Sequence, residues 1–201
     1  EEARMERHLG KDYSWLDERV FVRRIQVPET WSGMKLYDFH KKAFKNINVI
    51  RAIRGSEEFL MPGAEFTLMA RDSLDIMGME EQLVPCIELL VENEGVKAVN
   101  NKSITLHKYV MDSKLNQGGH AEKIICCPIR IDEKSEFHKK TIRTSGFREK
   151  YKGFIIGIER GNIPICNPNL RMSIEKGDLL WVVGDKEMAD RLLISWEFEK
   201  E

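Results

Sequence analysis

The sequence predicts an α+β protein built from two tandem copies of one small unit, each ordered strand, helix, strand, hairpin, strand, helix. Three observations predict this fold class. Segments 49–83 and 155–189 align without a gap, the same turn-forming residues recur at one spacing in both, and apolar alternation gives way to helical spacing in the same order. The two copies are joined by a segment that we expect to be partly helical.

The aligned segments share eight residues across 35 positions, where ordinary composition would give about two. Glycine, proline and aspartate weigh most among them, because these residues determine turns. The shared residues are Ile50 and Ile156, Arg54 and Arg160, Gly55 and Gly161, Pro62 and Pro168, Asp72 and Asp178, Leu74 and Leu180, Gly78 and Gly184, and Glu81 and Glu187.

In the first copy, "VFVRRIQV" predicts a strand and "PETWSGMKLYDFHKKAF" a turn followed by an amphipathic helix. The next strand is "INVIRAIRG", and Gly55 closes it at a hairpin where we expect a positive φ. Pro62 requires an extended or turn conformation in the preceding residue. "ARDSLDIMG" then predicts a turn and a strand, and "MEEQLVPCIELL" a helix.

The second copy repeats this order with "KIICCPIRI", "SEFHKKTIRTSGFREKY", "GFIIGIERG" and "EKGDLLWVVG". Its last helix lies in "DKEMADRLLISW", with Asp185 as the predicted N-cap. Lys139 stands where the first copy has Gly33. We therefore expect the turn before the helix to differ between the copies.

These patterns divide the chain into a charged connector at 1–19, a first domain at 20–90, a linker at 91–121, a second domain at 122–195 and a tail at 196–201. In the linker, "KSITLHKYVMDSKL" fits a helix, and "SITLHKYVM" fits a strand. Helical spacing of its apolar residues favours the helix. "LNQGGHAE" is expected to be a mobile loop.

The composition argues against several functions. Charged residues make up 32% of the chain with a net charge of −1, and both signs are mixed, so no overall field favours nucleic acid or an anionic membrane. No apolar run approaches the roughly 18 residues needed to cross a bilayer. The five histidines are scattered, and no catalytic, phosphate-binding or dinucleotide motif is present. We expect neither catalytic residues nor a metal site.

The four cysteines show no C-x-x-C spacing. They lie in apolar surroundings, and adjacent Cys126 and Cys127 would point to opposite faces of a strand. Buried reduced thiols are expected, which favours a cytosolic compartment.

The segments "IIGIERGNIPICNPNLRMSIEKGDLLWVVGDKEM" and "VIRAIRGSEEFLMPGAEFTLMARDSLDIMGMEEQL" resemble the RCK C-terminal domain, also called TrkA-C. The resemblance covers roughly residues 20–90 and 122–195. The chain departs from the family pattern at Arg71 and Lys139, where the family usually has glycine.

This resemblance implies a cytosolic regulatory region of a monovalent cation transporter, either of the potassium type or of the sodium/proton antiporter type. The expected partner is a membrane transport domain of the same full-length chain, which would place this region on the cytoplasmic side of the inner membrane. The absence of a Rossmann fingerprint favours an antiporter or carrier tail. The alternative is a stand-alone homo-oligomeric adaptor or scaffold that is not fused to a transporter.

The resemblance also implies paired domains, in a homodimer or an intramolecular pseudo-dimer, and in some members a small ligand such as cyclic di-AMP between them. We expect no other cofactor and no nucleic-acid partner. The candidate ligand-binding residues lie on the two matching strands, where arginines could pair with an anion and isoleucines contact a base: Ile50, Arg54, Ile155, Ile156 and Arg160. The alternative is that the arginines form ion pairs and the isoleucines fill the core.

Overall fold

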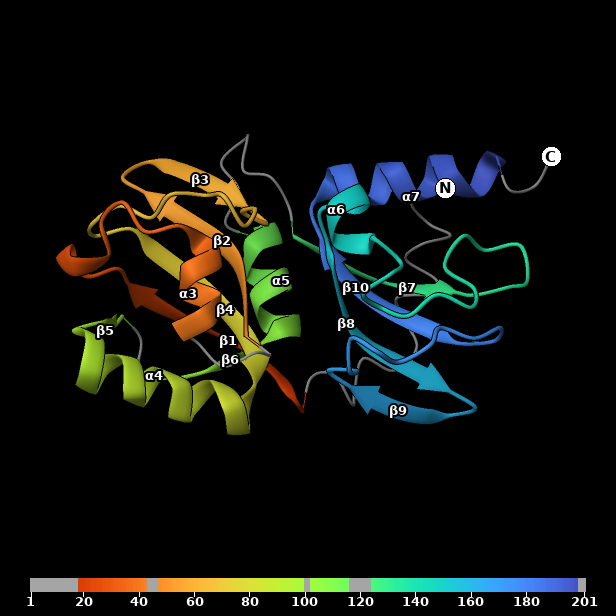
Figure 1. Cartoon of the computed structure of the whole chain (residues 1–201), viewed down its shortest axis with the longest axis horizontal. Coiled ribbons are helices and arrows are strands. Elements are labelled where there is room, and N and C mark those ends of the chain that lie inside the picture. Colours follow the sequence, from red (N-terminus) through yellow and green to blue (C-terminus); the bar gives the residue numbers. More distant parts are fainter. Residues whose placement is uncertain (1–17, 43–46, 100–101, 116–123, 199–201) are drawn as a thin grey trace. The chain divides into compact units, whose positions relative to one another are not determined.

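A computed structural model describes residues 18–42, 47–99, 102–115 and 124–198 (Figure 1). The chain divides into two compact units. The first unit is Asp17–Tyr109, and the second contains Val110–Glu201.

The first unit is an antiparallel sheet with helices packed on it. Its strands are β1 (Val20–Gln26), β2 (Asn48–Arg54), β3 (Glu57–Leu60) and β4 (Ser73–Met79), with the short strands β5 (Lys97–Ala98) and β6 (Ile104–Thr105). They run in the order β3-β2-β4-β1-β5, and β6 also pairs with β1. A 3₁₀ turn, η1 (Glu29–Trp31), precedes α3 (Leu36–Lys42), and α4 (Glu80–Glu94) follows β4.

The second unit repeats this arrangement. Its four strands run in the order β7-β10-β8-β9, all antiparallel. They are β7 (Ile125–Arg130), β8 (Phe154–Arg160), β9 (Ile163–Cys166) and β10 (Leu179–Gly184), with the helices α6 (Phe147–Tyr151) and α7 (Lys186–Phe198). This order corresponds to β1-β4-β2-β3 in the first unit, so the predicted α+β fold with repeated units is confirmed.

The pairing of the two central strands is also the same, residue by residue. Ile53 faces Ser73 in the first unit, and Glu159 faces Leu179 in the second. The register then shifts between Val49 and Arg51, and again at the matching place beside Trp181 and Val182. A β-bulge therefore occurs at the same point in both sheets.

One face of each sheet forms the core under the helices. In the first unit, Leu74 and Ile76 of β4 pack with Phe39 of α3 and Ile87 of α4. In the second, Leu180 and Val182 of β10 pack with Tyr151 of α6 and Met188 of α7. These helices place their apolar stripes on alternate strand residues, which is what the predicted periodicities require. Asp185 accepts a hydrogen bond from the Met188 backbone N–H at 2.8 Å, so the predicted N-cap of α7 is confirmed.

The turn before the first helix does not differ between the units, and the expectation drawn from Lys139 is wrong. Gly33 has φ 88° and Lys139 has φ 63°. Each donates its backbone N–H at 2.8 Å to the carbonyl of an equivalent residue, Leu68 in one unit and Ile174 in the other. Lys139 thus adopts the left-handed conformation that glycine adopts more easily, and the network of backbone hydrogen bonds holds it there.

At a second turn the glycine is in the second unit and the larger residue is in the first. Arg71 of the first unit has φ 68°, and Gly177 of the second has φ 89°. Both donate to the residue that follows the first strand, Val27 or Ile131. At the hairpins Gly55 and Gly161 have φ 60° and 55°, which confirms the predicted positive φ.

The helix predicted in the linker is present as α5 (Leu106–Leu115), which spans the boundary between the two units in the sequence. The start of the same stretch forms β6. Both readings of this segment therefore hold in part. The loop expected at "LNQGGHAE" and most of the connector at 1–19 lie outside the described residues. Cys86, Cys126 and Cys127 are buried and all four cysteines are free thiols. Within the described ranges, no helix combines the length and apolarity needed to cross a bilayer.

Lys139→Gly is expected to stabilise the second unit by about 1 kcal/mol, because glycine removes the cost of a left-handed backbone. The Lys139 side chain is exposed, so little packing is lost. Urea unfolding followed by circular dichroism measures the change. Lys140→Gly is the matched control: Lys140 is not among the positive-φ residues, so glycine there should destabilise by about 0.5–1 kcal/mol. Equal effects of both changes would contradict the argument.

Candidate functional site

The two matching arginines at the hairpins form the same network in both units. Arg54 donates from Nε and Nη2 to the two carboxylate oxygens of Asp72, at 2.9 and 2.7 Å. Its Nη2 also donates to the carbonyl of Thr67 at 2.8 Å. Asp72 in turn accepts a hydrogen bond from the Met69 backbone N–H at 2.8 Å. The carboxylate is 1% exposed and the arginine side chain 36%.

The second unit repeats each of these bonds. Arg160 donates to Asp178 at 2.8 and 2.7 Å and to the carbonyl of Ser173 at 2.7 Å. The Glu175 backbone N–H donates to Asp178 at 2.8 Å. Hydrogen bonding to the buried aspartate raises the pKa of both arginines above the ordinary value. The pair joins the end of the second strand to the turn that precedes the last strand.

The bulge in each central strand is joined to a second unusual backbone position. Ile50 and Ile156 are the residues left without a partner on the last strand. Their carbonyls accept hydrogen bonds from Met61 and Asn167, each at 3.0 Å. Met61 has φ 45° and Asn167 has φ 46°. Such a conformation is costly for methionine, and backbone strain of this kind is often found where a protein binds a ligand.

The structure shows where each candidate ligand-binding residue lies and what it contacts. Arg54 and Arg160 do form ion pairs, as the alternative interpretation expected. Ile50 and Ile156 are 0% and 5% exposed, whereas Ile155 is only partly buried and packs against the core under the helices. Ile50 and Ile156 are absent from those cores, so they do not lie on the face of the sheet that carries the core. A contact of any of these residues with a ligand stays a prediction.

The hairpins differ in the chemistry that they expose. Across from Ile53 and Arg54, the first hairpin carries Glu58 and Glu57. Across from Glu159 and Arg160, the second carries Pro164 and Ile163, and Ile163 is 66% exposed. A negatively charged ligand is therefore better accommodated at the hairpin of the second unit.

A second charged cluster exists in the first unit, and sequence reasoning missed it. Asp75 of β4 is 1% exposed. It accepts hydrogen bonds from Arg24 of β1 at 2.6 and 2.9 Å and from Arg51 of β2 at 2.7 Å. Tyr109 of α5 donates its hydroxyl to Asp75 at 2.5 Å. The available signal was a charged residue in the apolar run "SLDIMGM", with arginines in both neighbouring strands.

This cluster fixes the charge of Asp75. Burial by itself would raise the pKa of the carboxyl, but the hydrogen bonds from Arg24 and Tyr109 and the positive charges of Arg24 and Arg51 lower it below the ordinary value. Burial, with the negative charge of Asp75, raises the pKa of Tyr109. At neutral pH the cluster therefore contains an ionised aspartate and a neutral tyrosine, and through Tyr109 it ties the start of α5 to the sheet of the first unit.

The second unit replaces the cluster with apolar groups. Trp181 stands at the register position of Asp75, and it faces Pro128 on β7 and Gly157 on β8. Pro128 and Gly157 thus take the positions of Arg24 and Arg51. A large ring beside a residue without a side chain is a common way to fill a sheet face. At equivalent positions of the sheet, the first unit therefore has a cluster of charged side chains and the second has an aromatic ring.

No group of three or more histidine, cysteine, aspartate or glutamate side chains within the described ranges is arranged to hold a metal ion. Burial raises the pKa of Cys127 to about 12. Its thiol is therefore protonated at neutral pH, and it is a poor nucleophile.

Residues 129–193 match the model of the TrkA-C domain family. The matched residues all lie in the second unit, so it is this unit that carries the similarity to the TrkA-C family. The first unit has the same strand order, bulge and arginine–aspartate pair. The chain thus contains the TrkA-C fold as a tandem arrangement, as the sequence predicted. No curated protein matches the chain.

Among solved structures, the chain is similar to the RCK C domain dimer of S. agalactiae BusR in complex with c-di-AMP. The identity is 26% over 36% of this chain and 96% of that chain, with a TM-score of 0.33. It is also similar to the RCK C domain of the potassium transport protein KtrA in complex with c-di-AMP, at 23% identity over 43% and 91% of the two chains and a TM-score of 0.34.

A third similar structure is the GsuK RCK domain, at 11% identity over 88% of this chain and 64% of that chain, with a TM-score of 0.33. BusR has also been solved in complex with its busA-promotor DNA, and that structure matches at 21% identity over 56% and 54% of the two chains, with a TM-score of 0.32. None of these TM-scores reaches 0.5.

Arg160→Ala is expected to destabilise the second unit by about 2–3 kcal/mol, because it leaves the buried carboxylate of Asp178 without its main partner. The partial exposure of the arginine keeps the cost below that of a fully buried pair. Chemical unfolding of the intact chain measures it. Arg143→Ala, which removes an exposed arginine of the same unit, is the control. A cost below about 0.5 kcal/mol for Arg160→Ala would contradict a structural role for the pair.

Asp75→Asn is expected to destabilise the first unit at pH 7 and to weaken the dependence of its stability on pH. Because the folded-state pKa of Asp75 is lowered, its contribution is complete above the unfolded value of about 4 and is lost as the pH falls through the folded value. Unfolding free energies measured from pH 6 down to pH 2 test this. The exposed Asp190→Asn serves as control, and parallel pH curves for the unmodified protein and Asp75→Asn would refute the assignment.

Proposed function

We propose that this chain is a ligand-sensing regulatory region of a monovalent cation transport system, located on the cytoplasmic side of the inner membrane. The observation that carries the proposal is the TrkA-C domain at 129–193, with its hairpin network repeated bond for bond in the first unit. The region acts on transport by binding, without chemistry of its own, and its working partner is a membrane transport domain of the same full-length chain.

The proposed regulation uses pairing of TrkA-C units, between two chains or within one. A unit of so few strands has a second sheet face that needs a cover. In the first unit, α5 contributes to that cover through Tyr109. Pairing therefore involves the second unit above all, since its sheet lacks the charged cluster that holds α5 in the first.

The proposed ligand is an anionic nucleotide, and cyclic di-AMP is the first to test. The guanidinium Nη1 atoms of Arg54 and Arg160 are directed away from the hydrogen bonds to aspartate, which use Nε and Nη2. We assign these atoms to the ligand phosphates, and Ile50 and Ile156, which lie off the core face, to the apolar contacts with a base. Ile155 packs against the core under the helices and supports the strand from the other face. The acidic pair Glu57 and Glu58 disfavours an anion at the first hairpin, so the second is the principal site.

Calorimetric titration with cyclic di-AMP, ATP and NADH tests the ligand. Because Arg160→Ala would damage the fold, the informative change transfers the acidic hairpin to the second unit: Ile163→Glu with Pro164→Glu. We expect the affinity for cyclic di-AMP to fall at least about tenfold. Glu57→Gln with Glu58→Gln in the first hairpin is the reciprocal control and should preserve or improve binding. If the unmodified protein shows no heat of binding with any of the three nucleotides, the ligand proposal is wrong.

The second candidate is a stand-alone homo-oligomeric regulator or adaptor that is not fused to a transporter. The family match in the second unit is compatible with this candidate too, because it covers residues 129–193 alone and includes no transport domain. The expectation of no nucleic-acid partner remains a prediction for this chain. Reading the gene upstream of Glu1 separates the candidates: apolar spans in the same reading frame support the transporter tail, and a start codon directly before Glu1 supports the stand-alone form.

A further inference from the structure

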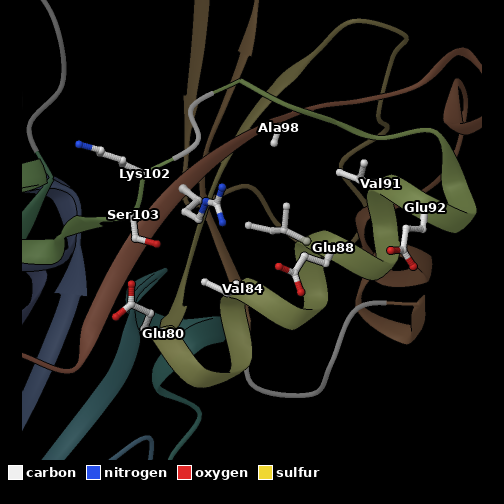
Figure 2. Close-up of a pocket in the computed structure, with 10 residues that line it drawn as sticks. Glu80, Val84, Glu88, Val91, Glu92, Ala98, Lys102 and Ser103 are labelled. Carbon is white, nitrogen blue, oxygen red and sulfur yellow. The ribbon is translucent and has the colours of Figure 1, made fainter.

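The first unit contains an open groove that has no counterpart among the described residues of the second unit. It lies between α4 and the edge of the sheet where β5 and β6 pair with β1, and its volume is about 580 Å³ (Figure 2). The lining residues from α4 are Glu80, Val84, Ile87, Glu88, Val91 and Glu92, and those from the sheet and the segment after it are Arg23, Ala98, Lys102 and Ser103. The second sheet ends at β7 within the described residues, so it has no second wall.

The charged side chains of α4 are all negative. Its 15 residues include five glutamates and neither lysine nor arginine, whereas α7 contains both Lys186 and Arg191. Glu88 and Glu92 are one turn apart, so they repel each other on the same side of the helix. They also lie in its C-terminal half, where the helix dipole disfavours negative charge. This arrangement lowers the stability of the isolated helix, and a positive charge placed over the two carboxylates would offset it.

The apolar groups of the groove lie beside this negative end. Figure 2 shows Val91 and Glu92 together on the last turns of α4, with Ala98 opposite Val91, while Lys102 and Ser103 lie toward the end near Glu80. Val91 is 42% exposed, and Glu88 and Glu92 are exposed. The groove thus has an apolar floor and an acidic end at Glu88 and Glu92. Toward its other end Lys102 lies near Glu80, and Arg23 also lines the groove. The groove follows α4 for about three turns, roughly 18 Å.

We propose that this groove binds a cationic amphipathic segment of a partner protein, with lysine or arginine over Glu88 and Glu92 and an apolar side chain against Val84, Val91 and Ala98. The acidic helix supplies the charge complementarity, and the length of the wall suits a helical or extended peptide of several residues. A second copy of this chain is a poorer match, because α4 would meet another α4 of the same sign. The interaction does not depend on the proposed nucleotide.

A labelled amphipathic peptide of leucine, alanine and lysine, about 14 residues long, is the probe. Fluorescence anisotropy with the intact chain should show saturable binding that weakens as salt is raised. Glu88→Lys and Val91→Asp should each weaken it at least about fivefold. Glu81→Lys makes the same charge change on α4, at an exposed residue outside the groove, and should leave the affinity within about twofold.

Three outcomes of the peptide titrations would overturn the proposal. The first is no saturable binding to the unmodified chain. The second is an equal loss with Glu81→Lys and Glu88→Lys, which would indicate attraction to the overall charge of the helix alone. The third is equal binding of a control peptide in which serine replaces each leucine, since this would exclude the apolar floor. Sedimentation of the unmodified chain and of Val91→Asp tests the second copy as occupant, and self-association lost in the variant would assign the groove to it instead.

Discussion

A buried aspartate that receives both nitrogens of one arginine is the interaction on which each unit depends. Asp72 and Asp178 are almost completely shielded from water, and each bonds a guanidinium and a backbone N–H of its own turn. The pair connects two places that are 18 residues apart in the chain. If either partner were missing, a charge would stay buried without compensation. The hairpin and the turn before the last strand are therefore held as one piece.

This constraint explains why the other backbone features repeat so faithfully. Beyond the anchored hairpin, the second strand accommodates one extra residue against the last strand, at the bulge of Ile50 or Ile156. The carbonyl of that residue then meets the backbone of Met61 or Asn167 in a left-handed conformation. Methionine in one unit and asparagine in the other thus adopt the same backbone conformation and donate the same hydrogen bond.

On this shared backbone the two units have acquired different surfaces. The first has a charged cluster around Asp75 that holds α5, an acidic hairpin and the groove beside α4. The second has Trp181 in place of the aspartate and an apolar hairpin with Ile163. A region that receives a small ligand through one unit and contacts a partner protein through the other can couple the two events. Two copies can thus divide tasks that a single domain would need to combine.

The sequence by itself determined the repeat, the element order, the α+β class and the resemblance to the TrkA-C family. Glycine, proline and aspartate carry local backbone requirements, and the periodicity of apolar residues reports burial, so both are readable along the chain. Tertiary structure alone decided what Lys139 does, because its left-handed conformation is imposed by a hydrogen bond to the distant Ile174. It also decided the roles of Arg54, Arg160 and Asp75. A charged residue in a strand is expected to lie on the surface unless its partners elsewhere in the fold are known. The groove depended on tertiary structure for the same reason: two residue pairs of β5 and two of β6 against β1 form its second wall, and such short strands leave no periodic pattern in a sequence.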